Sequence, residues 1–293
     1  MAKKLVILDA GHAAATGGKR APDGSLLEWE FNNNMQYRLK KRLEQLGFMV
    51  YLVNPTPEKG ADKSLANRCK DANKYWAAQG KPNCLYVSLH ANASGGSTWS
   101  NARGVEVFTS KGCSARSSSA AKKICNAIYK DVYAVDKGFK NRGHKTNNYY
   151  VVRYTNMPAC LIEYEFYTNK DGVNLLKNKR TLLCEATLKG ICEHFGVAYK
   201  MSVDITKEKE NGGKLPSTSK PWKNGTYNAK VKVTAKDGLN VRRGRPGSDK
   251  YNEKLGVLPE GTVVEVGYCL NGWFGVIYNG KQGFISGDYV KLV

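Results

Sequence analysis

The sequence lacks paired cysteines, a long apolar run and a recognisable leader segment. Its eight cysteines include no C-x-x-C pair, which argues against a zinc–thiolate cluster. Seven of them precede residue 200 and one follows it. Both numbers are odd, so disulfide bonds within either segment would leave at least one cysteine unpaired. We therefore expect free thiols, most of them buried, as in a protein of a reducing compartment.

No segment is long and apolar enough for a transmembrane helix, so the sequence predicts no membrane insertion. The first apolar run, Leu5–Leu8, is too short for a signal peptide and no small-residue cleavage site follows it. We expect a protein made in its host's cytoplasm without a signal peptide. Any action outside the cell would then require a separate release route.

The composition is that of a folded protein with an unusual charge. Hydrophobic residues make up 41% of the 293 residues and charged residues 24%, which is ordinary for globular domains. The length allows one large core and a smaller second one. The net charge of +21 predicts attraction to a polyanion, and nucleic acid, an anionic membrane surface and an anionic cell wall all qualify.

Residues 1–199 alternate between apolar runs and amphipathic segments. Continuous apolar runs predict strands buried on both faces, and apolar residues at helical spacing predict helices. The predicted strands are Leu5–Leu8, Phe48–Val53, Cys84–Leu89, Gly104–Phe108 and Cys160–Glu163, and the predicted helices are Asn32–Leu46, Ser64–Trp76, Ser117–Tyr133 and Leu175–Phe195. This order indicates an α/β fold with a mostly parallel sheet flanked by helices.

The character of the sequence changes after residue 199. Residues 200–225 are rich in charged residues, Gly, Ser and Pro and have no apolar periodicity, so we expect a linker. Short alternating runs separated by turn residues fill 226–293. They predict a small all-β barrel as a second domain.

Candidate chemistry gathers where predicted strands end. His12, His90 and Glu163 each follow or end an apolar run, and functional side chains of parallel sheets collect at that edge. Two imidazoles and a carboxylate form the ligand set of many catalytic zinc sites. Glu28 and Glu30 both fit as the acidic ligand, and Glu163 is either a catalytic base or a surface acid.

The other two histidines have different surroundings. His144 lies in a Gly- and Asn-rich segment that we expect to be a loop, where it is a candidate for substrate binding. His194 lies near the end of a predicted helix, where the helix dipole favours a cation.

Four motifs in order match a known family: Leu8-Asp9-Ala10-Gly11-His12, Glu28-x-x-x-Asn32, Ser88-Leu89-His90-Ala91-Asn92 and Pro158-x-x-Leu161-Ile162-Glu163-x-x-Phe166. Over roughly residues 3–197 the chain resembles the zinc-dependent N-acetylmuramoyl-L-alanine amidases. The resemblance implies zinc held by His12, Glu28 and His90, with Glu163 as catalytic acid/base. It favours Glu28 over Glu30, because Glu28 precedes Asn32 by four residues. The implied substrate is the peptidoglycan amide between the lactyl group of muramic acid and L-alanine.

The C-terminal segment has the motifs Gly238-Leu239-Asn240-Val241-Arg242, Asn271-Gly272-Trp273 and Gly280-x-x-Gly283-Phe284. It resembles a bacterial Src-homology-3 domain, which implies a cell-wall-binding module. Trp273 is either a wall contact or a core residue.

These features together predict an endolysin of a phage that infects a Gram-positive host, acting at the cell wall after release and not on nucleic acid. A host autolysin or a spore-lysis amidase is the near alternative. A non-catalytic basic protein that binds cell wall or nucleic acid, and a zinc peptidase acting further along the stem peptide, belong to other classes. The oligomeric state does not follow from the sequence.

Overall fold

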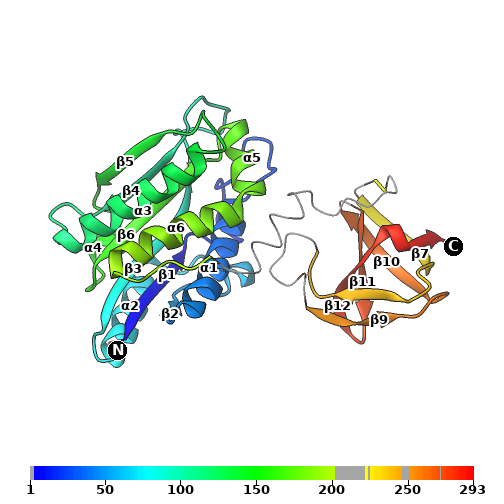
Figure 1. Cartoon of the computed structure of the whole chain (residues 1–293). Helices are drawn as coiled ribbons and strands as arrows, with labels where there is room; N and C mark the ends of the chain where they lie inside the picture. Colours follow the sequence, from blue (N-terminus) through cyan, green and yellow to red (C-terminus); the bar gives the residue numbers. More distant parts are fainter. Residues whose placement is uncertain (1–2, 202–221, 224, 246–250, 252, 271) are drawn as a thin grey trace. The chain divides into compact units, whose positions relative to one another are not determined.

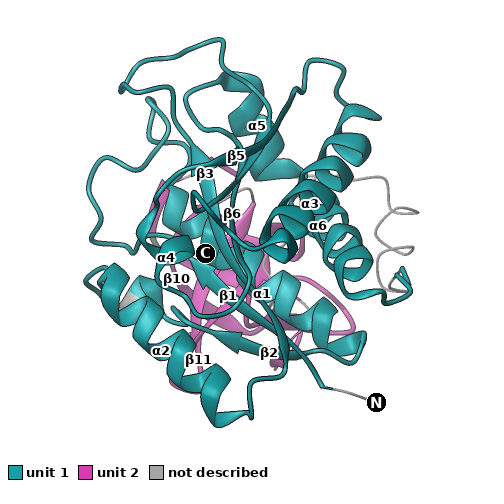
Figure 2. Cartoon of the chain, turned by 90° about the vertical axis from the view of Figure 1, so that its left-hand side faces the viewer, with its two compact units in different colours: residues 1–205 teal, residues 206–293 magenta. Residues whose placement is uncertain are grey.

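The computed structural model describes residues 3–201, 222–223, 225–245, 251, 253–270 and 272–293. The chain divides into two compact units, residues 1–205 and 206–293 (Figure 2). Most of the predicted linker 200–225 lies outside the described residues. Each unit is therefore described by itself.

The first unit is built on a six-stranded sheet with strand order β2-β1-β3-β6-β4-β5 (Figure 1). The four strands from β2 to β6 are parallel, β4 runs antiparallel to β6, and β5 is parallel to β4. The strands are β1 (Lys4–Ala10), β2 (Met49–Leu52), β3 (Asn83–Asn92), β4 (Val105–Thr109), β5 (Asn141–Thr146) and β6 (Ala159–Phe166). The predicted α/β fold with a mostly parallel sheet is confirmed.

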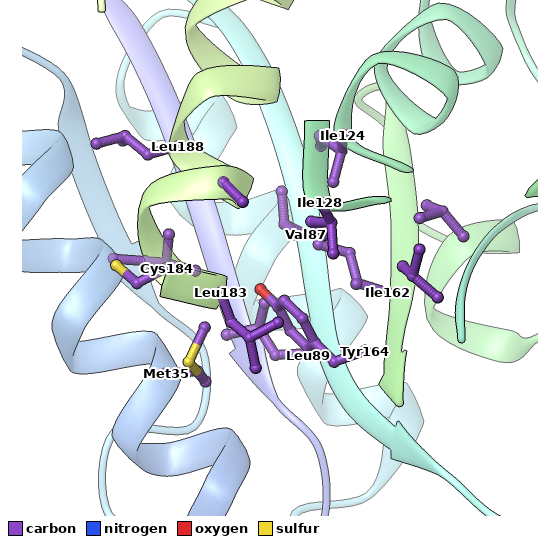
Figure 3. Close-up of a cluster of buried hydrophobic side chains, with 14 of the residues drawn as sticks. Met35, Val87, Leu89, Ile124, Ile128, Ile162, Tyr164, Leu183, Cys184 and Leu188 are labelled. Atoms are coloured by element: carbon purple, nitrogen blue, oxygen red, sulfur yellow. The ribbon is translucent and has the colours of Figure 1, made fainter. Parts of the chain in front are cut away.

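Helices cover both faces of this sheet. Alternate residues of the central strands pack into two separate clusters, one with α1, α3 and α6 and the other with α2 and α4. In the first cluster, Met35, Ile128 and Leu183 meet Val87 and Ile162 of the strands (Figure 3). The helices are α1 (Glu28–Gln45), α2 (Leu65–Ala78), α3 (Ala115–Tyr133), α4 (Tyr150–Arg153), α5 (Lys170–Asn178) and α6 (Arg180–Phe195), with a short 3-10 turn at Pro57–Lys59. Burial of each such aliphatic side chain contributes about 1.5–3 kcal/mol.

Two sequence expectations for this unit are wrong. The predicted helix Leu175–Phe195 is two helices, because Lys179 leaves the helical conformation with φ −124° and ψ 28°. The break lets α5 pack on β6 while α6 packs on α1 and α3. The segment around His144 is not a loop but strand β5, whose polar sequence NRGHKT hides the strand because an edge strand needs no apolar alternation.

The second unit is an antiparallel all-β structure with strand order β13-β7-β10-β11-β12-β8-β9. Its strands are β7 (Gly225–Val233), β8 (Leu239–Arg242), β9 (Lys254–Leu258), β10 (Val263–Leu270), β11 (Trp273–Tyr278), β12 (Lys281–Ser286) and β13 (Val290–Leu292), with a 3-10 turn at Gly287–Tyr289. Small aliphatic residues and Phe274 fill its core. The predicted all-β second domain is confirmed.

Among the described residues, no helix combines the length and apolar character that crossing a membrane requires. All eight cysteines are free, and seven of them are buried. Burial raises the pKa of the Cys84 and Cys160 thiols to about 12, so these thiols stay protonated and act as apolar core groups.

Candidate metal centre

His12, Glu28 and His90 meet at the carboxyl edge of the parallel strands. His12 follows β1, Glu28 is the first residue of α1, and His90 lies near the end of β3. Each offers one ligand atom, and these atoms all lie within 4.8 Å of one another. The structure thus brings together three residues that are far apart in the sequence.

The carboxylate of Glu28 lies between the two imidazoles. Its Oε1 is 2.9 Å from Nδ1 of His90, and its Oε2 is 3.4 Å from Nε2 of His12. Glu28 is only 2% exposed. Burial by itself would raise the pKa of Glu28, but hydrogen bonds and charge from the two histidines outweigh it and lower the pKa below its ordinary value. Glu28 is therefore ionised, the state that a metal ligand needs.

The turn after β1 is fixed in an uncommon conformation. His12 has φ 65°, in the left-handed region that non-glycine residues rarely adopt. Asn54 Nδ2 donates to the His12 carbonyl at 3.0 Å, and Asn32 Nδ2 donates to the Gly11 carbonyl at 3.0 Å. Gly11 itself lies against the ring of His90. The surroundings thus hold the backbone that aims His12 at Glu28.

A hydrogen-bonded network, buried except for Asp62, lies behind His12. Nδ1 of His12 is 3.6 Å from Oδ2 of Asp62, and Asp62 Oδ1 accepts from Arg68 Nη2 at 2.6 Å. Arg68, 1% exposed, also pairs with Asp9, which accepts from the Tyr86 hydroxyl at 2.6 Å. A carboxylate beside the far nitrogen of a histidine ligand fixes its tautomer and orientation, so Asp62 is suited to orient His12.

Glu163 lies one strand away from His90. The two residues are register partners between β3 and β6, and Glu106 of β4 is the partner of Glu163 on its other side. The Glu163 side chain is partly exposed, but its Oε2 is buried and accepts no hydrogen bond from the residues that the structure describes. Burial, followed by the negative charges of Glu28 and Glu106, raises the pKa of Glu163 well above its ordinary value. A carboxyl whose pKa is raised holds a proton more readily than an ordinary glutamate, as a general acid/base must.

Glu106 has a different environment from its neighbour. Its Oε1 accepts from Asn92 Nδ2 at 2.6 Å, and its Oε2 accepts from Arg142 Nε at 2.8 Å and from Lys145. Burial alone would raise the pKa of Glu106, but the two cations lower it. Two adjacent carboxyl groups therefore have pKa values displaced in opposite directions, with Glu163 the one suited to proton transfer.

The other candidates from the sequence lie outside this group. Glu30 is exposed on α1. His144 on β5 shares a hydrogen bond of 2.8 Å with the Thr109 hydroxyl. Its register partner Val107 packs against α1, α3 and α6, so His144 lies on the opposite face of the sheet from Glu106. His194 is the penultimate residue of α6, and burial together with nearby cations lowers its pKa to about 4, so the dipole does not hold it as a cation.

Trp273 lies on β11 of the second unit. It is 6% exposed and packs edge-to-face against Tyr251 with ring centroids 5.5 Å apart. Its indole nitrogen is buried without a hydrogen-bond partner among the described residues. The ring therefore contacts its own domain, and a role of Trp273 in wall binding stays a prediction.

The comparison with protein families decides what this fold and site belong to. Residues 6–193, more than half of the chain, match the N-acetylmuramoyl-L-alanine amidase family. The chain belongs to this family. Residues 237–291 match the bacterial SH3 domain. The predicted activity is confirmed, and this chain is an N-acetylmuramoyl-L-alanine amidase.

Individual relatives agree with this assignment. The endolysin of Bacillus phage SPP1 is 31% identical over 223 residues, which are 74% of each chain. The catalytic domain of CwlV, an amidase of Bacillus (Paenibacillus) polymyxa var. colistinus, has a TM-score of 0.52 at 28% identity, over 67% of this chain and 99% of that one. The fold is also similar to that of an N-acetylmuramoyl-L-alanine amidase from Clostridium difficile 630. Its TM-score is 0.58 at 24% identity, and the match covers 67% of this chain and 98% of that one.

Sequence reasoning gave no role to Asp62, Glu106, Arg142 or Lys145. The last two were missed because β5 was expected to be a loop. The sequence did contain one indication that such cations exist. Glu106 lies within the apolar run Gly104–Phe108, and a buried carboxylate requires cationic or hydrogen-bonding partners.

Proposed function

We propose that this amidase uses a zinc ion held by His12, Glu28 and His90. The observation that carries the proposal is the convergence of one carboxylate and two imidazoles within 4.8 Å. This donor set suits zinc and leaves a coordination position for water or substrate. The imidazole nitrogens that face the Glu28 carboxylate are Nε2 of His12 and Nδ1 of His90, so these would be the ligand atoms.

Zinc, when bound, supplies a Lewis acid that lowers the pKa of a water and polarises the scissile carbonyl. Glu163 removes the proton from the attacking water through its buried Oε2, which has no hydrogen-bond partner in the described part of the chain. It then returns this proton to the nitrogen of L-alanine as the amide to the lactyl group breaks. Asp62 holds the His12 ring in place throughout.

The proposed biological role is that of an endolysin acting on the peptidoglycan of a Gram-positive wall after release. Two observations support it. The similarity to the endolysin of Bacillus phage SPP1 extends over 74% of both chains, and the second unit matches the bacterial SH3 domain. We propose that this unit binds the wall, and that the net charge of +21 favours an anionic wall rather than nucleic acid.

A second role has its own support. The germination-specific N-acetylmuramoyl-L-alanine amidase of Bacillus subtilis is 25% identical over 205 residues, which are 66% of this chain and 80% of that one. A host autolysin or a spore-lysis amidase therefore remains the alternative. Lysis of growing cells compared with spores, after addition of the purified protein, distinguishes the two.

The test of the catalytic proposal is digestion of purified Gram-positive walls with and without a chelator, followed by identification of new amino-terminal residues. We expect L-alanine, with activity lost in chelator and restored by zinc. Glu163→Gln should keep bound zinc and lose turnover, whereas His90→Ala should lose both. Turnover by Glu163→Gln close to the wild-type rate would overturn the role of Glu163. New amino termini on other residues would indicate a peptidase.

A further inference from the structure

Strand β5 brings two cations to the face of the sheet that carries Glu163. Lys145 is the register partner of Phe108, which packs on the face of the sheet that α2 and α4 cover. Glu106 lies two residues before Phe108 and therefore on the same face. Glu163 is in turn the register partner of Glu106. Lys145 is therefore two strands from the proposed catalytic residue, on the same side of the sheet.

Arg142 reaches this face because the strand pairing is irregular. Val105 pairs with Asn141, but Glu106 pairs with Gly143, so Arg142 is an extra residue in β5. A bulge of this kind redirects a side chain and is common next to active sites. The bulge lets Arg142 Nε donate to the same carboxylate oxygen of Glu106 that Lys145 binds.

The pair is held in place and still has binding capacity. The Arg142 guanidinium lies over the ring of Phe166, 4.8 Å from its centroid, and the Arg142 side chain is 36% exposed and that of Lys145 41%. Within the described part of the chain, only Nε of Arg142 donates to protein. One carboxylate faces two cations, so the Arg142–Lys145–Glu106 group keeps an excess positive charge on the face of the sheet that carries Glu163.

We propose that Arg142 and Lys145 bind a carboxylate of the peptide part of the substrate, on the residue that follows L-alanine. The inference rests on the proposed hydrolysis at the His12–Glu28–His90 centre. Arg142 has two terminal nitrogens available for a bidentate contact with a carboxylate, and Lys145 adds a point charge. The two cations also offset the repulsion that Glu163 and Glu106 exert on an anionic peptide. Glu106 acts as a positioning residue that orients both cations.

The test compares two soluble disaccharide-peptides that differ only at the stem residue after L-alanine, which carries either a free carboxylate or a carboxamide. We expect the wild type to have a kcat/KM at least about tenfold higher on the carboxylate form, as a lost charge-assisted hydrogen bond typically causes. Arg142→Gln with Lys145→Gln should abolish this preference by raising KM on the carboxylate form. Glutamine can still donate to Glu106, which protects the fold.

Lys130→Gln is the matched control, because Lys130 is exposed on α3, which covers the other face of the sheet. It should keep the preference. The dissociation constants of both substrates for Glu163→Gln provide a readout without turnover and should show the same preference. Equal kcat/KM of the wild type on both forms, or an equal loss on both in the double variant, would overturn the inference. Release of L-alanine amino groups from neither form would overturn the proposed hydrolysis, and the inference with it.

Discussion

The ring of His90 occupies the space that a side chain at Gly11 would need. A Cβ on Gly11 would lie 2.1 Å from Cε1 and 2.4 Å from Nε2 of His90, far inside van der Waals contact. The end of β1 and the end of β3 can therefore approach only because residue 11 is glycine. This close approach sets the position of the His90 imidazole relative to Glu28.

Gly11→Ala should displace the His90 ring and weaken the metal centre. Because the alanine methyl overlaps the imidazole, we expect bound zinc to fall and activity to drop at least about tenfold, together with about 1–3 kcal/mol of stability from overpacking. Zinc content and wall turnover measure the first two effects. Gly17→Ala is the matched control, since no described residue comes within 4 Å of the position that its methyl group would take. Normal zinc content in Gly11→Ala would contradict the prediction.

Asp62→Asn should weaken metal binding without unfolding the protein. Asp62 lies 3.6 Å from Nδ1 of His12, and loss of such a partner typically costs about 10–100-fold in metal affinity or activity. Competition with a chromogenic chelator measures the zinc affinity. Asp131→Asn makes the same chemical change on α3, where Asp131 pairs with Lys189 of α6, and should leave the affinity unchanged. Equal affinities of the two variants would exclude an orienting role for Asp62.

The sequence predicted the layers of the first unit because buried parallel strands and amphipathic helices have distinct patterns. The run Leu5–Leu8 is apolar throughout because both faces of β1 are covered. The edge strand β5 was missed for the opposite reason, since its polar side chains face solvent or the site. No Pro or Gly marks the break at Lys179 in the sequence. It depends on tertiary packing, of α5 on β6 and of α6 on α1 and α3.

The three ligand candidates were predictable as strand-end residues, but their geometry was not. Choosing Glu28 over Glu30 required the family resemblance. The structure shows the physical difference between them, because α1 begins at Glu28 and directs its side chain inward while Glu30 is exposed. Asp62 escaped notice because its contact to His12 spans fifty residues and no local pattern records it.

Arg68→Met should be strongly destabilising. Arg68 and Asp9 are both 1% exposed and form an ion pair, so removal of the guanidinium leaves the Asp9 charge buried. The expected loss is about 3–5 kcal/mol in the free energy of unfolding, measured by urea denaturation. Lys40→Met, which breaks the surface pair with Glu44, should cost less than about 1 kcal/mol. A loss below about 1 kcal/mol for Arg68→Met would show that water reaches Asp9.

His194→Gln should reduce the loss of stability in acid. Burial, followed by the charges of Arg116 and Lys123, lowers the pKa of folded His194 from 6.5 to about 4, and its Nε2 is buried without a partner among the described residues. The unfolded state therefore binds more protons than the folded state between these values. The stability contribution of neutral His194 is complete above about pH 6.5 and is lost as the pH falls toward 4.

Because His194 is only half-buried, solvent screening limits this contribution to about 1–2 kcal/mol. Urea denaturation at pH 7.5 and pH 4.5 should show a decline with acid that is smaller by this amount in His194→Gln than in the wild type. The imidazole titration, followed by NMR in the wild type, provides an independent check. A His194 pKa near 6.5 in the folded protein, with identical declines in the two proteins, would mean that the ring is solvated and that its protonation does not affect folding.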